Sequence, residues 1–377
     1  MLGEFAILDT TLREGEQFAT CFFRREDRIA LAKQLDAFGI EYIEVSSPVV
    51  SASAGDDIRE LAALGLRARI MAHCRCQAED VLQALDCGAQ GINLFQGSSS
   101  LLRSYSHGRS LEEIAANAVS LIRLLKDRGV FVRFSAEDAF RTEVADLTTV
   151  LDPVVAAGVD RIGLPDTTGA ATPTQVLRRI EFFRDRYGIS MEFHGHNDTG
   201  CAIANALAAL EGGADVIDTT ILGIGERNGI TSLNGLIARL YSLDRNLVAR
   251  YRLANLADLD SFVSALVNVP IPFNAPITGF TAFTHKAGVH TNAVLRRPET
   301  YEVLNPSDFG LQRRIEVASR ITGKAAVRHR AAELGLTLDE STLRDVTRRI
   351  KSLAEQRPLS LADVDAALNA SRSAMAG

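Results

Sequence analysis

The sequence has few cysteines, and their spacing defines neither a disulfide framework nor a zinc site. The thiols are an odd set in 377 residues, and Cys74-x-Cys76 has no second pair that would complete a tetrahedral site. The five are Cys21, Cys74, Cys76, Cys87 and Cys201. Sparse, reduced thiols of this kind are typical of a cytoplasmic protein.

Long runs of one charge sign and long apolar runs are also absent. The net charge of −6 is spread along the chain, which argues against binding to nucleic acid or to a membrane surface. No apolar run approaches the roughly 20 residues of a membrane span. The first residues lead directly into Phe5-Ala6-Ile7-Leu8, without the basic and apolar regions of a signal peptide. We therefore expect a cytoplasmic protein that acts on a small molecule.

Short apolar segments alternate with amphipathic segments along the first two thirds of the chain. The expected strands cover residues 5–9, 42–46, 69–73, 91–95, 130–135, 161–165, 191–194 and 216–221. Helical periodicity lies between them, at residues 26–38, 77–87, 111–127, 146–157, 174–187 and 201–211. This order predicts an α/β fold, a (β/α)8 TIM barrel. An open doubly wound sheet is less favoured, because no Gly-x-Gly-x-x-Gly follows the first strand.

A proline-rich segment at residues 270–276 marks a change in composition after the barrel, since proline cannot continue a helix. We expect the catalytic barrel over residues 1–260 and a linker and lid over residues 261–310. A small helical C-terminal subdomain is expected over residues 311–377, with helices near 324–334, 343–353 and 361–368.

Polar residues gather where the expected strands end, which is the face of such a barrel that holds the active site. They include Asp9, Glu44, His73, Asn93, Arg133, Ser135, Glu137, Asp138, Asp166, Thr167 and Asp218. Charged groups that converge on one mouth need a ligand that neutralises them. A divalent metal and an anionic substrate would do so, although Asp9 and Asp218 could instead only hold loop backbone.

His194 and His196 lie two residues apart at the end of an apolar strand, so both imidazoles point to the same side. This arrangement is typical of metal ligands and needs a third ligand from elsewhere in the chain. The alternative is a pair of histidines that only hydrogen-bond to the backbone at the strand end.

Three segments in this order resemble the metal-dependent Claisen-condensing barrels that include homocitrate synthase and 2-isopropylmalate synthase. They are residues 9–17 (DTTLREGEQ), 194–198 (HGHND) and 223–229 (GIGERNG). Residues 133–138 (RFSAED) are most similar to homocitrate synthase. The resemblance extends from the first strand to about residue 310.

The resemblance implies that Glu14, His194 and His196 bind a divalent metal, which could be zinc, manganese or magnesium. Such an ion polarises the keto group of a 2-oxo acid. In the family an arginine similar to Arg13 supports the keto oxygen and the enolate. The resemblance further implies that Arg133 and Thr167 hold the C1 carboxylate of the substrate, with Ser135 near its chain.

Acetyl-CoA is the second substrate that the resemblance implies. Glu137 and His290 are the candidates for proton transfer from its methyl group. The glycine-rich segment after the eighth strand is a candidate for binding the cofactor, through Gly223, Gly225, Glu226, Arg227 and Asn228. In the family the segment with His290 belongs to a lid that reaches the active site of a neighbouring subunit, so we expect a homodimer with exchanged lids.

The choice of 2-oxo acid depends on the pocket for its distal end, which the resemblance assigns to His73 and Asn93. Lysine-pathway homocitrate synthases carry an aspartate at the position of Asn93, where it also serves the ammonium group of lysine as inhibitor. Neutral Asn93, with Arg75, Gln96, Ser98–Ser100 and Arg103 nearby in sequence, could favour a phosphonate. The leading hypothesis is condensation of acetyl-CoA with 2-oxoglutarate to homocitrate. The alternatives are phosphonopyruvate giving phosphonomethylmalate, 2-oxoisovalerate giving isopropylmalate, and a metal-dependent lyase.

Overall fold

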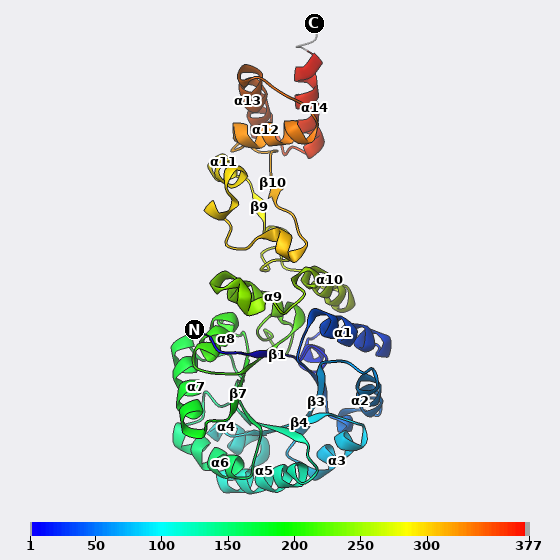
Figure 1. Ribbon diagram of the computed structural model, residues 1–377, viewed down its shortest axis with the longest axis vertical. Coiled ribbons are helices and arrows are strands. Elements are labelled where there is room, and N and C mark those ends of the chain that lie inside the picture. The colour runs from blue at the N-terminus through cyan, green and yellow to red at the C-terminus, as the bar shows by residue number, and fades with distance from the viewer. Residues whose placement is uncertain (1, 374–377) are drawn as a thin grey trace. The chain divides into compact units, whose positions relative to one another are not determined.

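The computed structural model describes residues 2–373 and divides into two compact units, Met1–Ile271 and Pro272–Gly377. Figure 1 shows the first unit as a ring of strands surrounded by helices. The division falls after α10 (Leu256–Val267), so the helix that spans the expected boundary at residue 260 lies in the barrel unit. Among the described residues, no helix is long and apolar enough to cross a membrane.

Eight parallel strands close into a barrel in sequence order, with β1 pairing with both β2 and β8. The strands are β1 (Ala6–Asp9), β2 (Tyr42–Ser46), β3 (Arg69–Arg75), β4 (Gly91–Gly97), β5 (Phe131–Glu137), β6 (Arg161–Asp166), β7 (Ser190–Gly195) and β8 (Val216–Thr219). The predicted TIM barrel is therefore confirmed. β3, β4 and β5 each run two residues beyond their predicted ends, because their backbones stay paired where the side chains become polar.

Helices cover the outside of the barrel (Figure 1). The longer ones, of nine to sixteen residues, are α1 (Arg25–Phe38), α2 (Ala54–Ala63), α3 (Ala78–Asp86), α5 (Leu111–Lys126), α6 (Val144–Ala156), α7 (Pro173–Tyr187), α8 (Ala202–Glu211), α9 (Leu233–Leu243) and α10. Capping side chains mark the start of some of them, including α5 and α7. At α7, for example, the hydroxyl of Thr172 accepts from the Gln175 N–H, the Gln175 side chain accepts from the Thr172 N–H, and Pro173 takes the first helical position.

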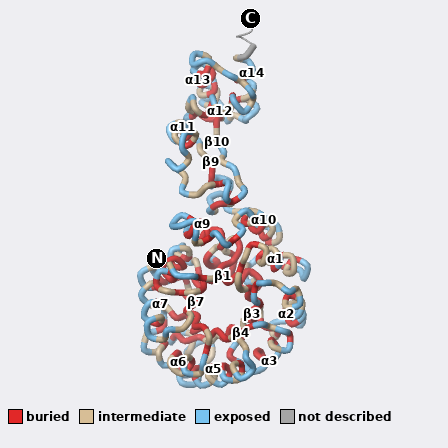
Figure 2. Tube along the Cα trace, in the orientation of Figure 1, coloured by how far each residue is buried: buried red, intermediate tan, exposed pale blue. Residues whose placement is uncertain are grey.

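The alternation of side chains along each strand decides which residues reach the barrel interior. In β7, Met191 and Phe193 pack outward into the apolar layer under the helices, whereas Glu192 and His194 point inward. Both sets are buried, as the red strands of Figure 2 show. A small apolar cluster of Leu8, Met71 and Val216 also lies among the strands. Apart from this cluster, the inward-facing side chains named above are polar, and the candidate site lies among them.

The second unit contains a short parallel pair of strands and a helical core. The strands are β9 (Thr284–His285) and β10 (Arg314–Ile315), and α11 (Gly288–Arg296) follows β9. Three further helices, α12 (Lys324–Glu333), α13 (Glu340–Gln356) and α14 (Leu361–Ser373), pack around Val327, Leu343, Ile350 and Leu368. The helical tail expected from the sequence therefore has its own apolar core.

Candidate active site

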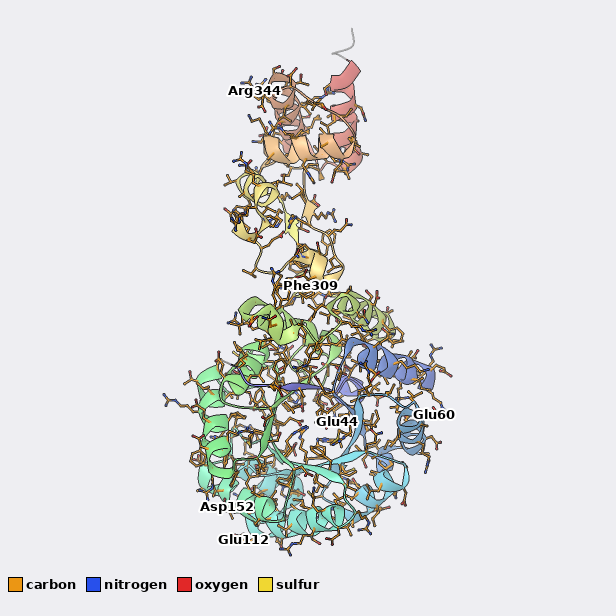
Figure 3. All side chains as sticks on the ribbon, viewed as in Figure 1. Glu44, Glu60, Glu112, Asp152, Phe309 and Arg344 are labelled. Atoms are coloured by element: carbon orange, nitrogen blue, oxygen red, sulfur yellow. The ribbon has the colours of Figure 1, made fainter. Side chains whose placement is uncertain are left out.

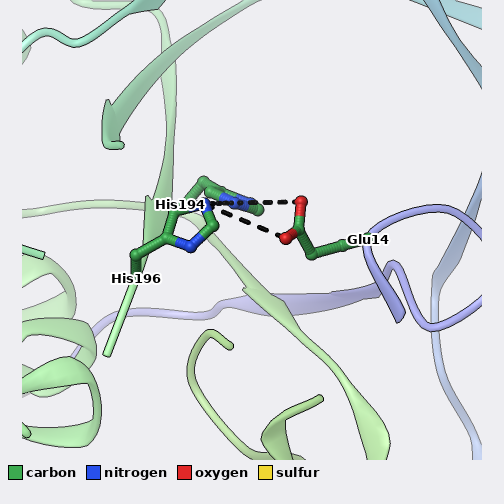
Figure 4. A group of neighbouring side chains, drawn as sticks. All are labelled: Glu14, His194 and His196. Carbon is green, nitrogen blue, oxygen red and sulfur yellow. Dashed lines mark hydrogen bonds and ion pairs between the residues drawn. The ribbon is translucent and has the colours of Figure 1, made fainter. Parts of the chain in front are cut away.

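Glu14, His194 of β7 and His196 just after that strand form the metal-ligand cluster found among the described residues. Figure 4 shows the carboxylate facing both imidazole rings. The Nε2 atoms of His194 and His196 are 3.3 Å apart, and the Glu14 oxygens lie 3.9 and 4.0 Å from them. All three donor atoms lie within 4.8 Å of one another. Two imidazoles and one carboxylate are a donor set that suits zinc, manganese or a similar divalent ion.

Neighbouring groups hold two ligands of this cluster, Glu14 and His194, whereas the buried Nδ1 of His196 has no hydrogen-bond partner. Glu14 Oε1 accepts from the backbone N–H of Glu226 at 2.8 Å, and Oε2 accepts from Arg13 Nη1 at 2.5 Å. Burial raises the pKa of Glu14, but Arg13 and the histidines outweigh burial and lower it to about 2. His194 Nδ1 lies 2.9 Å from Asp218 Oδ2, which orients its Nε2 toward the cluster.

The imidazoles of the cluster are neutral at ordinary pH. Burial lowers the pKa of His194 and of His196 to about 4, because a charged ring loses its hydration in the barrel. A neutral imidazole keeps the lone pair that a metal needs. With Glu14 ionised, the protonation states of all three side chains fit a bound cation.

Arg13 lies between two buried carboxylates. Its Nη1 reaches Glu14, and its Nε donates to Glu44 Oε2 at 2.8 Å. The hydroxyl of Thr10 donates to the same Glu44 oxygen at 2.8 Å. Glu44 is fully buried inside the ring of strands (Figure 3). The guanidinium is thus fixed beside the metal-ligand cluster, as a preorganised oxyanion stabiliser would be.

Arg133 belongs to a chain of buried charges that runs along the barrel interior. Its Nη1 contacts Glu192, and its Nε donates to Ser135 Oγ at 2.9 Å. Arg161 Nη1 donates to the other Glu192 oxygen at 2.8 Å, while its guanidinium lies over the Tyr42 ring. Glu192 therefore joins two arginines, and Arg133 still lines the cavity described below.

His73 and Asn93 meet at Glu44. The Asn93 amide donates to Glu44 Oε1 at 2.5 Å and lies 2.7 Å from His73 Nδ1. His73 Nδ1 is 3.2 Å from the same Glu44 oxygen, and its ring stacks on Phe95 with centroids 4.3 Å apart. Asn93 is fully buried and does not line the cavity described below, and its amide instead contacts His73 and Glu44.

Glu137 and Thr167 lie at the ends of neighbouring strands β5 and β6. Burial and the adjacent Asp138 raise the pKa of Glu137, which suits a group that exchanges protons. Asp138 has a left-handed backbone with φ of 64°, and its N–H donates to Thr167 Oγ1 at 2.9 Å. That contact leaves the Thr167 hydroxyl hydrogen available to a ligand.

One cavity of about 460 Å³ brings most of the expected site residues together, a volume ordinary for a small-molecule site. The expected residues that line it are Arg13, Glu14, His73, Arg133, Ser135, Glu137, Thr167, His194, His196, Glu226 and Arg227. Gly223, Gly225 and Asn228 are in the adjoining loop. His290 lies in the second unit on α11, where it is exposed and its ring centroid is 4.3 Å from that of Tyr301.

Two polar side chains of the loop Gly223–Gly229 contact other loops. Arg227 pairs with Asp198 and donates to the Thr167 carbonyl, and Asn228 donates to the Asn197 carbonyl. Its role in binding coenzyme A, expected from the sequence, stays a prediction.

Several of the polar side chains expected to favour a phosphonate form hydrogen bonds or ion pairs with other residues of the protein. Arg75 forms a two-bonded pair with Asp80, and Arg103 pairs with Asp146. Ser98 binds Thr142 and the Glu137 carbonyl. Of these side chains Arg75 lines the cavity, and its guanidinium is already paired there with Asp80.

The sequence interpretation assigned no role to Glu192 or Arg161, although both contact the Arg133 network. Alternation provides the missing signal for Glu192, because it lies two residues before His194 on the same face of β7. Glu44 and Asp218 were noted as polar strand ends only, and the structure places them beside Arg13 and His194.

Comparisons with known proteins agree with this geometry. The sequence model of the HMGL-like family matches residues 4–263, and the model described as "Homocitrate synthase post-HMGL domain-like" matches residues 277–358. A crystal structure of HMG-CoA lyase from Bacillus subtilis shares the fold, with a TM-score of 0.63, 21% identity and coverage of 71% of this chain and 95% of that one.

Two curated relatives are much more similar. The mitochondrial homocitrate synthase of Yarrowia lipolytica is 48% identical over 97% of this chain and 82% of the relative. The cytosolic isozyme of homocitrate synthase from Saccharomyces cerevisiae is 46% identical over 97% of this chain and 85% of the relative. Because relatives occur in both compartments, the cytoplasmic location stays a prediction. The chain belongs to the HMGL-like family and, within it, to the homocitrate synthases.

Proposed function

We propose that the chain is an acyltransferase that condenses acetyl-CoA with 2-oxoglutarate and hydrolyses the thioester to give homocitrate. The observation that carries this proposal is identity of 45–48% to five homocitrate synthases over nearly the whole chain. The match of residues 277–358 to the domain that follows the barrel in homocitrate synthase supports condensation over lyase chemistry.

Glu14, His194 and His196 would hold a divalent cation, which supplies Lewis-acid polarisation of the keto group. Arg13 stands next to Glu14 and would stabilise the negative charge that develops on the keto oxygen. Arg133, Ser135 and Thr167 line one cavity and offer donors of the kind that bind a carboxylate. We assign the C1 carboxylate of the 2-oxo acid to them.

Glu137 is the candidate for taking a proton from the methyl group of acetyl-CoA. It lines the cavity, and its raised pKa makes the carboxylate a better base than an exposed one. We further propose that His290 acts with it from the lid of a partner subunit, in a homodimer with exchanged lids. The exposure of His290 is compatible with such a role.

The experiment is release of free thiol from acetyl-CoA in the presence of a series of 2-oxo acids, with the product identified by mass spectrometry. We expect 2-oxoglutarate to give homocitrate with the highest kcat/KM. Faster reaction with phosphonopyruvate or 2-oxoisovalerate would transfer the assignment to those substrates. Cleavage of homocitrate without thiol release from acetyl-CoA would instead support the lyase.

A further inference from the structure

Several backbone groups of the loop Gly223–Gly229 form hydrogen bonds within the protein. The N–H groups of Gly223, Ile224 and Gly229 donate to carbonyls of the loop and its flanks at 3.2, 3.4 and 3.0 Å. The Ile230 N–H closes the loop by donating to the Gly223 carbonyl at 3.1 Å. The Glu226 N–H donates to a side chain outside the loop, Glu14 Oε1, at 2.8 Å. The loop therefore presents a backbone donor to a metal-ligand side chain.

Gly225 lies directly against the Glu14 side chain. A Cβ at this position would lie 2.8 Å from Glu14 Oε1 and 3.0 Å from Glu14 Cγ. The backbone of Gly225 is outside the left-handed region, so alanine would fit the local conformation. Space for Glu14, and not backbone strain, is what requires glycine here.

The same loop is fastened to the segment that carries the histidine ligands. The Asn197 N–H donates to the Gly229 carbonyl at 2.9 Å, and His196 forms an antiparallel bridge with Ile230. The ion pair of Arg227 with Asp198 adds a side-chain link. One rigid loop thus contacts Glu14 on one side and the strand end with His196 on the other.

We propose that the loop Gly223–Gly229 is a clamp that sets the distance between Glu14 and the histidines, and that Gly225 is a positioning residue for the Glu14 carboxylate. This inference rests on the proposed metal site. It gives the glycine-rich loop a role that does not depend on binding coenzyme A. Displacing Glu14 by the width of one methyl group would weaken metal binding while leaving the barrel intact.

The test is titration of metal-free protein with Co²⁺, followed by visible absorption, which reports affinity and coordination without any turnover. Gly225→Ala is expected to bind Co²⁺ about ten- to a hundredfold more weakly than the parent, the usual effect of disturbing a neighbour of a metal ligand. Gly3→Ala is the matched control, because nothing lies within 4 Å of a Cβ at that position. Thermal unfolding of the metal-free proteins checks that the fold is intact.

A double-mutant cycle with Glu14→Asp separates positioning from general damage. The shorter aspartate leaves room for the methyl group, so Gly225→Ala should cause no further loss of Co²⁺ affinity in the Glu14→Asp background. An equal loss in both backgrounds, or parent-like affinity of Gly225→Ala, would overturn the clamp. If Gly225→Ala does not fold, the double variant Glu14→Asp/Gly225→Ala tests the proposal. The clamp then requires that this double variant folds and binds Co²⁺ as tightly as Glu14→Asp alone. If His196→Ala shows the same Co²⁺ spectrum as the parent, the metal site itself is refuted.

Discussion

Asn93→Asp is a nearly isosteric substitution that should introduce a new titration into the distal pocket. In the parent, the Asn93 amide donates to Glu44 at 2.5 Å and faces His73 Nδ1 at 2.7 Å. An aspartate would replace that donor by a second carboxylate. Glu44 stays ionised, because Arg13 and His73 outweigh burial and hold its pKa well below the ordinary value. The variant therefore places two buried negative charges beside one imidazole.

The magnitude follows from two free energies of similar size. Two unit charges about 4 Å apart repel by about 4 kcal/mol at an effective dielectric constant of about 20. Burial, followed by Arg13, lowers the pKa of His73 to about 4. Holding a proton on His73 at pH 7 thus costs about three pKa units, or about 4 kcal/mol. A proton on His73 would relieve the repulsion, so we expect its pKa to rise to near neutrality in Asn93→Asp.

The assay is the pH dependence of KM for 2-oxoglutarate. Below the new pKa the variant pocket has the charge of the parent, and KM should be close to the parent value. Above it, one added negative charge faces the distal carboxylate, and KM should rise by about tenfold for each 1.4 kcal/mol of repulsion. KM for acetyl-CoA should not follow this profile.

Lysine gives the converse measurement. The parent should be inhibited weakly, and the variant about ten- to a hundredfold more tightly, if an ammonium–carboxylate hydrogen bond of roughly 1.5–3 kcal/mol is gained. Asn93→Ala is the control, since it removes the amide without adding charge. A parent already inhibited tightly by lysine, or a pH-independent KM in Asn93→Asp, would refute the reasoning.

Three further predictions concern the rest of the site. His196→Ala should lose bound metal and activity together while keeping its circular dichroism spectrum, and an active, fully metallated variant would contradict the assignment. Mixing inactive His290→Ala with inactive Glu14→Ala should restore some activity if lids are exchanged; proven subunit exchange without recovery would count against it. In Asp138→Asn, loss of the neighbouring negative charge should lower the pKa of Glu137. The acid limb of the kcat/KM profile, where activity falls as Glu137 gains a proton, should then move to lower pH by on the order of one unit or less. An unmoved limb would show that Asp138 does not tune Glu137.

The fold was predictable because the signals that specify a barrel are local and repeated. Each strand is a short apolar run whose alternation survives in the structure, as Met191 and Phe193 outward and Glu192 and His194 inward show. The exact ends of the strands were harder to predict from the sequence. β8 ends at Thr219 although Ile221 is apolar, because a 3-10 turn begins there, at Ile221–Gly223.

The metal-ligand cluster could not be predicted from local sequence pattern alone. His194 and His196 follow from their spacing, but Glu14 is 180 positions away and was assigned through family resemblance. The contact between Glu226 N–H and Glu14 is a backbone hydrogen bond, which no side-chain pattern encodes. Likewise, the resemblance assigns Asn93 to the distal pocket with His73, and the structure adds that both contact the buried Glu44. The sequence pattern identifies which side chains reach the mouth of the barrel. Tertiary packing determines which of those side chains contact one another.

The charges under the cavity bear on the choice of 2-oxo acid. A connected network joins three arginines and four carboxylates, namely Arg13, Arg133 and Arg161 with Glu14, Glu44, Glu192 and Asp218. The three arginines and four carboxylates nearly offset one another, and burial raises the pKa of Glu192 to about 8 against the effect of Arg133. A divalent cation and dianionic 2-oxoglutarate would bring equal and opposite charges and keep that balance. Monoanionic 2-oxoisovalerate, or a phosphonate of higher charge, would leave a net charge buried, which is costly in a low-dielectric interior.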